Sequence, residues 1–120
     1  MAEHNDIGRD GESVAASYIE KCGMQILQRN WRAGHLEIDI IARDGEQIVF
    51  VEVKTRKQKP THFSDVLSKS KIKNTIEAAN VYMRTKAIEA ECRFDLLLLT
   101  CNAETFDIEH IPNAYRSYLR

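Results

Sequence analysis

Two runs of branched and aromatic residues, joined by a tight-turn signal, constrain this chain more than any other feature. They form the segment HLEIDIIARDGEQIVFVEVKTR at residues 35–56. Branched and aromatic side chains favour strands, and Asp44-Gly45 is typical of a two-residue β-hairpin turn. The segment therefore predicts two antiparallel strands, at residues 36–43 and 46–56.

The predicted turn determines which residues of the hairpin face one another. Pairing Arg43 with Glu46 places Asp39 opposite Phe50 and Glu37 opposite Glu52. Ionisable side chains then share one face of the hairpin, and aliphatic side chains share the other. The charged face carries Glu37, Asp39, Glu52 and Lys54, and the apolar face carries Ile38, Ile40, Ala42, Val49, Val51 and Val53.

Carboxylates gathered on one strand face repel each other, at a cost of roughly 0.2–1 kcal/mol per close pair. A Mg²⁺ or Mn²⁺ ion held by Asp39 and Glu52 would offset this cost, because such ions prefer oxygen ligands and retain several waters. Lys54 on the same face is placed to orient or deprotonate a water, or to stabilise charge on a phosphate. This set suits phosphodiester hydrolysis. Glu-x-Lys is also common on exposed strand faces, where it keeps the surface soluble.

The rest of the chain predicts two helices and three more strands. Helical spacing covers residues 6–22, with Asp6 as the N-cap and Gly23 as the stop, and again residues 68–86. Strands are expected at residues 24–32, at 93–101 and around Phe106 and Ile108, ending at Pro112. The apolar run RFDLLLLTC at 93–101 is typical of a strand covered on both faces. The order α-β-β-β-α-β-β predicts one α/β domain over residues 1–120, with a sheet flanked by helices.

Charge is distributed unevenly along the chain. The net charge of −1 argues against a protein that holds nucleic acid by overall positive charge. Residues 54–86, however, contain nine Lys or Arg and two acidic residues, a net charge of +7, so the remainder carries −8. This segment is either a phosphate-binding surface or a solvated run of basic residues.

Several other classes are disfavoured by composition. No apolar run approaches the roughly 18 residues that span a bilayer, and the polar opening MAEHNDIGRDGE does not resemble a signal peptide. We therefore expect a cytoplasmic protein with no membrane partner. The cysteines, Cys22, Cys92 and Cys101, are odd in number and lack a C-x-x-C pair. They predict buried, reduced thiols rather than disulfides or a zinc site.

Three stretches of the sequence resemble a known family. GESVAASYIEKCGMQILQRNWR, LEIDIIARDGEQIVFVEVKTR and RFD are similar to the YraN family of nuclease-like proteins, over nearly the whole chain. That family resembles the PD-(D/E)xK nucleases, with a restriction-endonuclease-like fold and a mixed central sheet, and among them the Holliday-junction resolvases. Leu36 stands where the family pattern has glycine.

The resemblance implies roles for four residues. It implies Asp39 and Glu52 as metal ligands, Lys54 as the catalytic lysine, and Glu12 as an additional acid that reaches the metal through water. Glu37 matches a further acid of the family pattern. By helical geometry alone, Glu12 lies at the flank of the first helix, where a solvated side chain is the ordinary alternative.

Other residues carry weaker signals. Thr55, Arg56 and Lys71 are placed for phosphate contacts, although each has a solvated alternative. Trp31, between two arginines, is suited either to stacking on a base or to the core. His35 and His110 show no zinc-site spacing, so we assign them no chemistry.

Three hypotheses follow from the sequence. The first is a metal-dependent nuclease acting on DNA, including branched or recombination intermediates, and working as a monomer or a homodimer. The second is a module with the same fold that binds nucleic acid or protein without cutting. The third is an assembly protein that pairs through a sheet edge.

Overall fold

A five-stranded mixed sheet lies between two helices, which confirms the predicted α/β fold and the order α-β-β-β-α-β-β. The computed structural model describes the backbone of residues 3–60, 62 and 65–116, and the side chains of these ranges from residue 11 onward. The elements are α1 (Glu3–Lys21), β1 (Gln25–Ala33), β2 (Leu36–Asp44), β3 (Gln47–Arg56), α2 (Lys69–Thr85), β4 (Cys92–Asn102) and β5 (Thr105–Tyr115).

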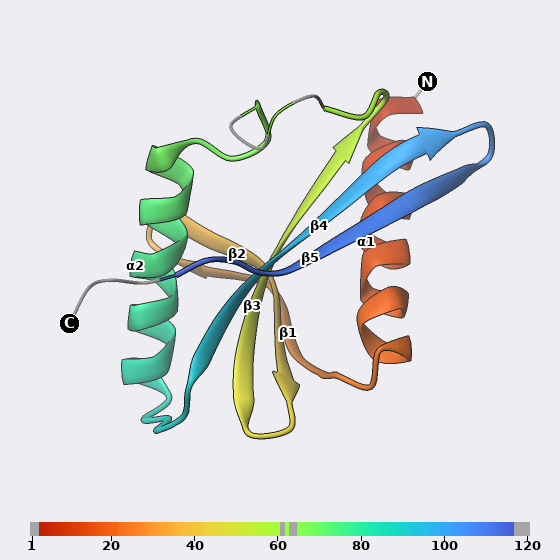
Figure 1. Ribbon diagram of the computed structural model, residues 1–120. Coiled ribbons are helices and arrows are strands. Elements are labelled where there is room, and N and C mark those ends of the chain that lie inside the picture. Colours follow the sequence, from red (N-terminus) through yellow and green to blue (C-terminus); the bar gives the residue numbers. More distant parts are fainter. Residues whose placement is uncertain (1–2, 61, 63–64, 117–120) are drawn as a thin grey trace.

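The strands follow one another across the sheet in chain order. Neighbouring strands are antiparallel except for β3 and β4, which are parallel because α2 forms the crossover between them. Figure 1 shows the two helices on opposite sides of this sheet, with α1 beside the β4–β5 hairpin and α2 beside the ends of β1 and β2. None of the described helices combines the length and the apolar character needed to cross a bilayer.

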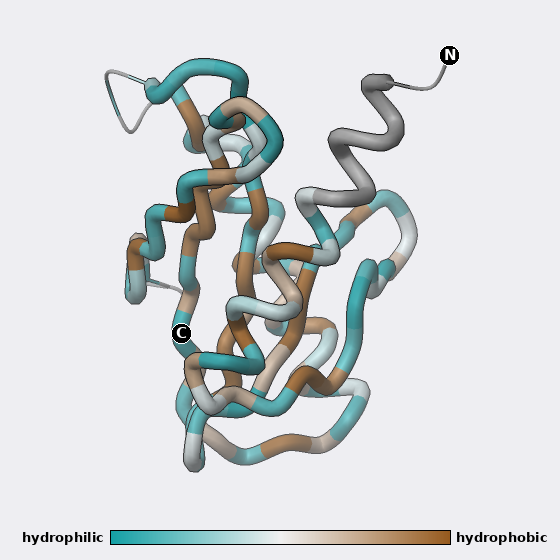
Figure 2. The backbone as a smooth tube through the Cα atoms, turned by 90° about the vertical axis from the view of Figure 1, so that its right-hand side faces the viewer, coloured by the Kyte–Doolittle hydropathy of each residue, from teal (hydrophilic) through white to brown (hydrophobic). Residues whose placement is uncertain are grey.

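The sheet has a hydrophobic cluster on each face. Ala15 and Ile19 of α1 pack on alternate residues of the central strands, including Ile40, Val49 and Leu97. Figure 2 shows hydrophobic stretches of the strands behind α1 and hydrophilic residues in the loops. The other cluster joins α2, including Ile76 and Tyr82, to the strand residues that alternate with those of the first cluster, among them Ile41, Ile48, Phe50 and Phe94.

Gly11 permits α1 to approach the sheet closely. A Cβ atom on Gly11 would lie 2.8 Å from Oγ1 of Thr55, so any larger residue would require a shift. At the other end, α1 stops at Lys21, and Gly23 follows with a φ of +90°. This confirms the predicted glycine stop. The helix begins at Glu3, so Asp6 lies within it and the prediction of Asp6 as the N-cap is wrong.

The register of the β2–β3 hairpin differs from the prediction by two residues. Asp44 pairs with Gln47 and Ile41 with Phe50, because the turn consists of Gly45 and Glu46 instead of Asp44 and Gly45. Glu37 is therefore not opposite Glu52. A shift of two residues preserves the side-chain alternation, so most of the predicted sorting of the two faces survives.

Ile38 is the exception to that sorting. It was predicted to share the face of Ile40, but it packs in the α2 cluster together with Leu36. The β2–β3 ladder ends at the pair Ile40 and Val51. The residues of β2 before Ile40 pair only with β1. In Figure 1 this part of β2 bends toward α2 while β3 runs away from it. The divergence of the strands turns the start of β2 toward the helix.

Two further predictions are wrong. Strand β5 continues beyond Pro112 to Tyr115, because an irregularity in its pairing with β4 accommodates the proline at the edge of the sheet. The cysteines are free, as expected, but Cys22 and Cys92 are exposed and Cys101 is half-buried. Thiols in strand and loop positions at the margin of the sheet need not be covered.

Candidate active site

Asp39 lies at the point where β2 separates from β3. Because the ladder between these strands ends at Ile40 and Val51, the backbone N–H of Val53 has no partner on the β2 backbone. The Asp39 side chain replaces that partner, and its Oδ2 accepts a hydrogen bond from Val53 N at 2.8 Å. The split in the sheet therefore fixes the position of this carboxylate.

Glu52 supplies a second carboxylate on the neighbouring strand. Its side chain is only 5 % exposed, and each of its oxygens faces a different lysine. Lys54 Nζ lies 3.4 Å from Oε2, and Lys71 Nζ, from the first turn of α2, lies 3.6 Å from Oε1. The sequence predicted Lys71 as a phosphate contact and did not predict its pairing with Glu52.

The two carboxylates influence each other electrostatically. Burial and the negative charge of Glu52 raise the pKa of Asp39 from 3.8 to about 6, against the hydrogen bond from Val53 and the charge of Lys71, which lower it. The two carboxylates therefore lie close enough for the charge of Glu52 to act on Asp39. A pKa shifted by a buried like charge is characteristic of functional sites.

The oxygen atoms of this pair suit a divalent cation. Within the described residues, no group of three or more His, Cys, Asp or Glu side chains gathers as a complete metal cage. Mg²⁺ does not require such a cage, because it is usually bound by one or two carboxylates while waters and substrate phosphates fill the other positions. Asp39, whose negative charge is disfavoured by burial and by the nearby charge of Glu52, fits that role.

The two other predicted acids have different surroundings from this pair. Glu37 forms an ion pair with Arg32, whose Nε lies 3.2 Å from Oε2, and Glu37 contributes least among the groups that shift the pKa of Asp39. Glu12 is exposed on α1, next to Gly11, which contacts Thr55 near the end of β3. The role of Glu12 as a water-mediated ligand stays a prediction.

The predicted nucleic-acid contacts divide between the two faces of the sheet. Thr55 is half-buried and faces α1, because Gly11 packs against its side chain. Arg56 is half-buried, and its Nη1 donates to the Thr55 carbonyl at 3.1 Å. Lys71, on α2 at the opposite face, forms an ion pair with Glu52.

Trp31 and His35 are the two remaining residues that the sequence singled out. Trp31 packs edge-on against Tyr82, with ring centroids 5.3 Å apart, at the margin of the α2 cluster. The core interpretation of Trp31 is therefore the one that its contacts support. His35 is exposed in the turn between β1 and β2.

Comparison with known protein families shows the family to which the chain belongs. Residues 11–99 match the model of the uncharacterised protein family UPF0102. The chain belongs to the UPF0102 family. It is 42% identical over 118 residues to a UPF0102 protein of Bacteroides thetaiotaomicron, with 96% of each chain covered. It is also 41% identical to a UPF0102 protein of Lawsonia intracellularis over 115 residues, covering 94% of this chain and 87% of the relative.

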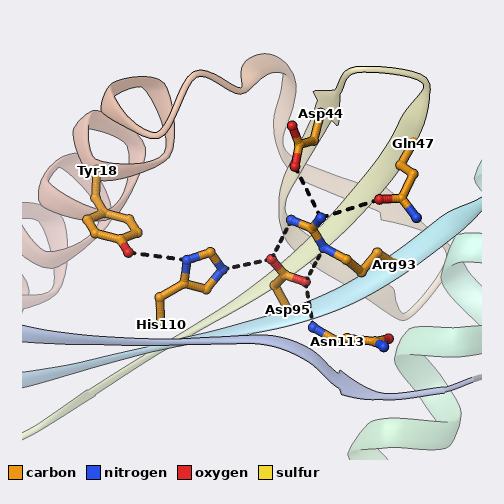
Figure 3. Close-up of polar contacts among 7 residues, drawn as sticks. All are labelled: Tyr18, Asp44, Gln47, Arg93, Asp95, His110 and Asn113. Atoms are coloured by element: carbon orange, nitrogen blue, oxygen red, sulfur yellow. Dashed lines mark hydrogen bonds and ion pairs between the residues drawn. The ribbon is translucent and has the colours of Figure 1, made fainter.

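The sheet carries two groups of polar residues. The segment that matches the UPF0102 model covers the first group wholly and the second in part, because His110 and Asn113 lie beyond residue 99. One is the pair of carboxylates with its lysines. The other surrounds Asp95, a fully buried aspartate in β4. Figure 3 shows the Asp95 carboxylate between Arg93 and His110. Arg93 donates to it through Nε at 2.9 Å and Nη2 at 3.0 Å, and His110 Nε2 lies 2.7 Å away.

The polar side chains around Asp95 form hydrogen bonds with one another on the α1 side of the sheet. His110 Nδ1 lies 3.2 Å from the Tyr18 hydroxyl, so the tautomer with hydrogen on Nε2 serves both partners. Burial would raise the pKa of Asp95, but the hydrogen bonds from Arg93, Asn113 and His110 outweigh it and the pKa is lowered. One sequence signal points to this network: Asp95 is a lone aspartate in an apolar run, where a buried charge requires partners.

Proposed function

We propose that this UPF0102 protein is a metal-dependent nuclease that hydrolyses phosphodiester bonds in DNA, with Asp39, Glu52 and Lys54 at its active centre. The observation that carries the proposal is the convergence of two carboxylates at the split between β2 and β3, where burial and Glu52 raise the pKa of Asp39 to about 6. The resemblance to the YraN family and the PD-(D/E)xK nucleases supports the same three residues.

The carboxylates would hold Mg²⁺ or Mn²⁺. Such an ion activates a water and neutralises charge on the phosphate. Asp39 is held in place for this task by Val53 N, and Glu52 by its position in the centre of the sheet. Because both ligands lie on strands, their oxygens keep a fixed separation as substrate binds.

The lysines would act on the substrate and on the attacking water. Lys54 projects from the same strand as Glu52, two residues further along, and is half-buried. From there it orients the water and stabilises the negative charge that develops on the phosphate. Lys71 brings a second positive charge to the same carboxylate from α2, so a phosphate that approaches Glu52 meets two cations.

The basic segment supports DNA as the substrate. Residues 54–86 carry a net charge of +7. They include both site lysines and the exposed Lys57, Lys59, Lys69 and Lys73. Exposed lysines on the same segment as the site lysines would attract the phosphates of a longer strand. The similarity of the YraN family to Holliday-junction resolvases favours branched DNA within this class.

Cleavage assays test the proposal. Purified protein is incubated with four-way junctions, flaps, forks and single strands, each with Mg²⁺, with Mn²⁺ and with EDTA. We expect metal-dependent cleavage that Asp39→Asn lowers by about 10²-fold or more, because the substitution removes a charged metal ligand. Asp107→Asn, the same change at an exposed site on β5, is the matched control and should cleave like the wild type.

The alternative is a module that binds DNA without cutting it. If the wild type and Asp39→Asn leave every substrate intact while both still bind DNA, the nuclease proposal is wrong and the binding module is correct. Binding is measured on the same substrates by gel shift in EDTA. Comparing binding with cleavage distinguishes a protein that binds DNA without cutting it from one that does not bind DNA.

A further inference from the structure

The last strand of the sheet, β5, contains extra unpaired residues opposite Asp95, a bulge that we call the insertion. His110 and Ile111 pair with Leu97 and Leu96, but Tyr115 is the next paired residue, opposite Phe94. Three residues of β5, numbers 112–114, therefore face Asp95 alone. Asn113 has a φ of +54°, in the left-handed region, which is typical of an irregularity that redirects a strand.

Asp95 holds this insertion in place. Its Oδ1 accepts a hydrogen bond from the Asn113 backbone N–H at 3.0 Å. The carboxylate itself is oriented by Arg93 and His110 (Figure 3). Arg93 is in turn held by Asp44, 3.1 Å from its Nη1, at the end of β2. The course of β5 after Ile111 is thus set by a buried and fully partnered aspartate.

The insertion carries Tyr115 onto the α2 face of the sheet. Its ring stacks on Phe94, with centroids 5.2 Å apart and planes at 23°. It packs against the α2 cluster and also against the cluster formed by Val66, Leu67, Leu96 and Leu98. Burial raises the pKa of Tyr115 to about 12, so its hydroxyl keeps its proton at neutral pH.

The Tyr115 hydroxyl is linked to the site through α2. It lies near the side chain of Thr75, which is itself buried, and the Tyr115 ring packs against the same two clusters as Ile72 in the first turn of α2. Thr75 Oγ1 donates to the Lys71 carbonyl at 2.9 Å. Lys71 is the residue whose Nζ lies 3.6 Å from Glu52. A continuous set of contacts therefore runs from β5 to the first turn of α2 and to the buried glutamate.

We propose that Tyr115 is a positioning residue, which fixes the first turn of α2 so that Lys71 faces Glu52, and that the Asp95-held insertion in β5 keeps Tyr115 in place. The importance of this arrangement for catalysis rests on the proposed function. The mechanical linkage does not, because it can be measured without substrate or metal. The network on one face of the sheet thereby supports the site on the other.

The first experiment removes the Tyr115 hydroxyl and keeps its ring. In Tyr115→Phe we expect the backbone amides of residues 72–75 to exchange hydrogen at least 5-fold faster than in the wild type, relative to the other amides of α2. Tyr82→Phe, which removes a buried hydroxyl from the same face, is the matched control and should leave this ratio unchanged. Equal exchange patterns in the two variants would overturn the role of Tyr115.

The second experiment tests the insertion at an exposed position, where folding is not at risk. Asn113→Val places a β-branched residue at a φ of +54° and should accelerate exchange in the first turn of α2, whereas Asn113→Gly accepts this φ and should not. If Asn113→Val leaves α2 unaffected, the linkage through β5 is wrong. The nuclease proposal is judged separately by cleavage, where Tyr115→Phe should lower kcat with little change in KM.

Discussion

Asp39 and Asp95 are two aspartates of one sheet with opposite electrostatic outcomes. Each lies on a central strand and accepts a hydrogen bond from the backbone of a neighbouring strand, Asp39 from Val53 and Asp95 from Asn113. Asp95 also receives Arg93 and His110, and its pKa is lowered. Asp39 is instead buried near the negative charge of Glu52, and its pKa is raised to about 6.

The difference lies in what neutralises the charge. The protein itself neutralises Asp95, whose bidentate arginine is a strong and geometrically specific partner. Around Asp39, the nearby lysines face the oxygens of Glu52, so Asp39 retains a charge that its surroundings disfavour. A carboxylate of the first kind serves the fold. One of the second kind is available to bind a cation.

The largest expected effect on stability comes from Asp95→Asn. The substitution leaves Arg93 without its buried partner, although Asp44 still pairs with it, so we expect a loss of about 3 kcal/mol in the free energy of unfolding. Because the folded pKa of Asp95 is lowered, this contribution is complete above the unfolded pKa of about 3.9 and disappears as the pH falls below it. Urea denaturation at pH 7 and pH 3 measures both.

The exposed Asp107→Asn provides the control for that measurement, since its stability should stay within about 0.5 kcal/mol of the wild type. If Asp95→Asn proved no less stable than Asp107→Asn, the Asp95 network would not serve the fold, and the contrast with Asp39 would collapse.

Asp39→Asn should have the opposite sign and a smaller size. The folded pKa of about 6 exceeds the unfolded value, so the folded state binds more protons between about pH 4 and pH 6 and the wild type loses stability as the pH rises through this window. Asn carries no charge and can still accept from Val53. We expect the variant to be about 2 kcal/mol more stable than the wild type at pH 8 in EDTA.

Below pH 4 the two proteins should converge, because Asp39 is then protonated in both states. A variant that is as stable as the wild type, or less stable, at pH 8 would show that Asp39 is not under electrostatic strain. A gain in stability together with a loss of cleavage would be the expected exchange at a functional site.

The sequence was sufficient for the order of elements and for most of the sorting of the hairpin faces. Side-chain alternation tolerates a register error of two residues, so most residues of the hairpin were assigned to the correct face from an incorrect turn. The turn itself was ambiguous, because glycine serves at either of its two positions. Ile38 was misplaced because the separation of β2 from β3 is a tertiary feature with no local signal.

The partners of the buried polar residues were harder to predict. Asp95 stood out in its apolar run, but His110 and Asn113 reach it from 15 and 18 residues away, through an irregularity that Pro112 concealed. Likewise, Lys71 comes from α2, whose placement relative to β3 depends on the packing of the whole α2 cluster. Residue types were readable in the sequence, whereas contacts between distant elements were not.

Glu37→Gln should have the smallest effect, and it marks the boundary of the site. Glu37 shares a strand with Asp39, but its partner is Arg32, whose side chain is 73% exposed. An exposed ion pair contributes roughly 0–1 kcal/mol, so we expect a stability change within about 0.5 kcal/mol and cleavage within about 3-fold of the wild type. Cleavage as low as that of Asp39→Asn would mean that Glu37 leaves Arg32 to join the metal, and the site would then contain three acids.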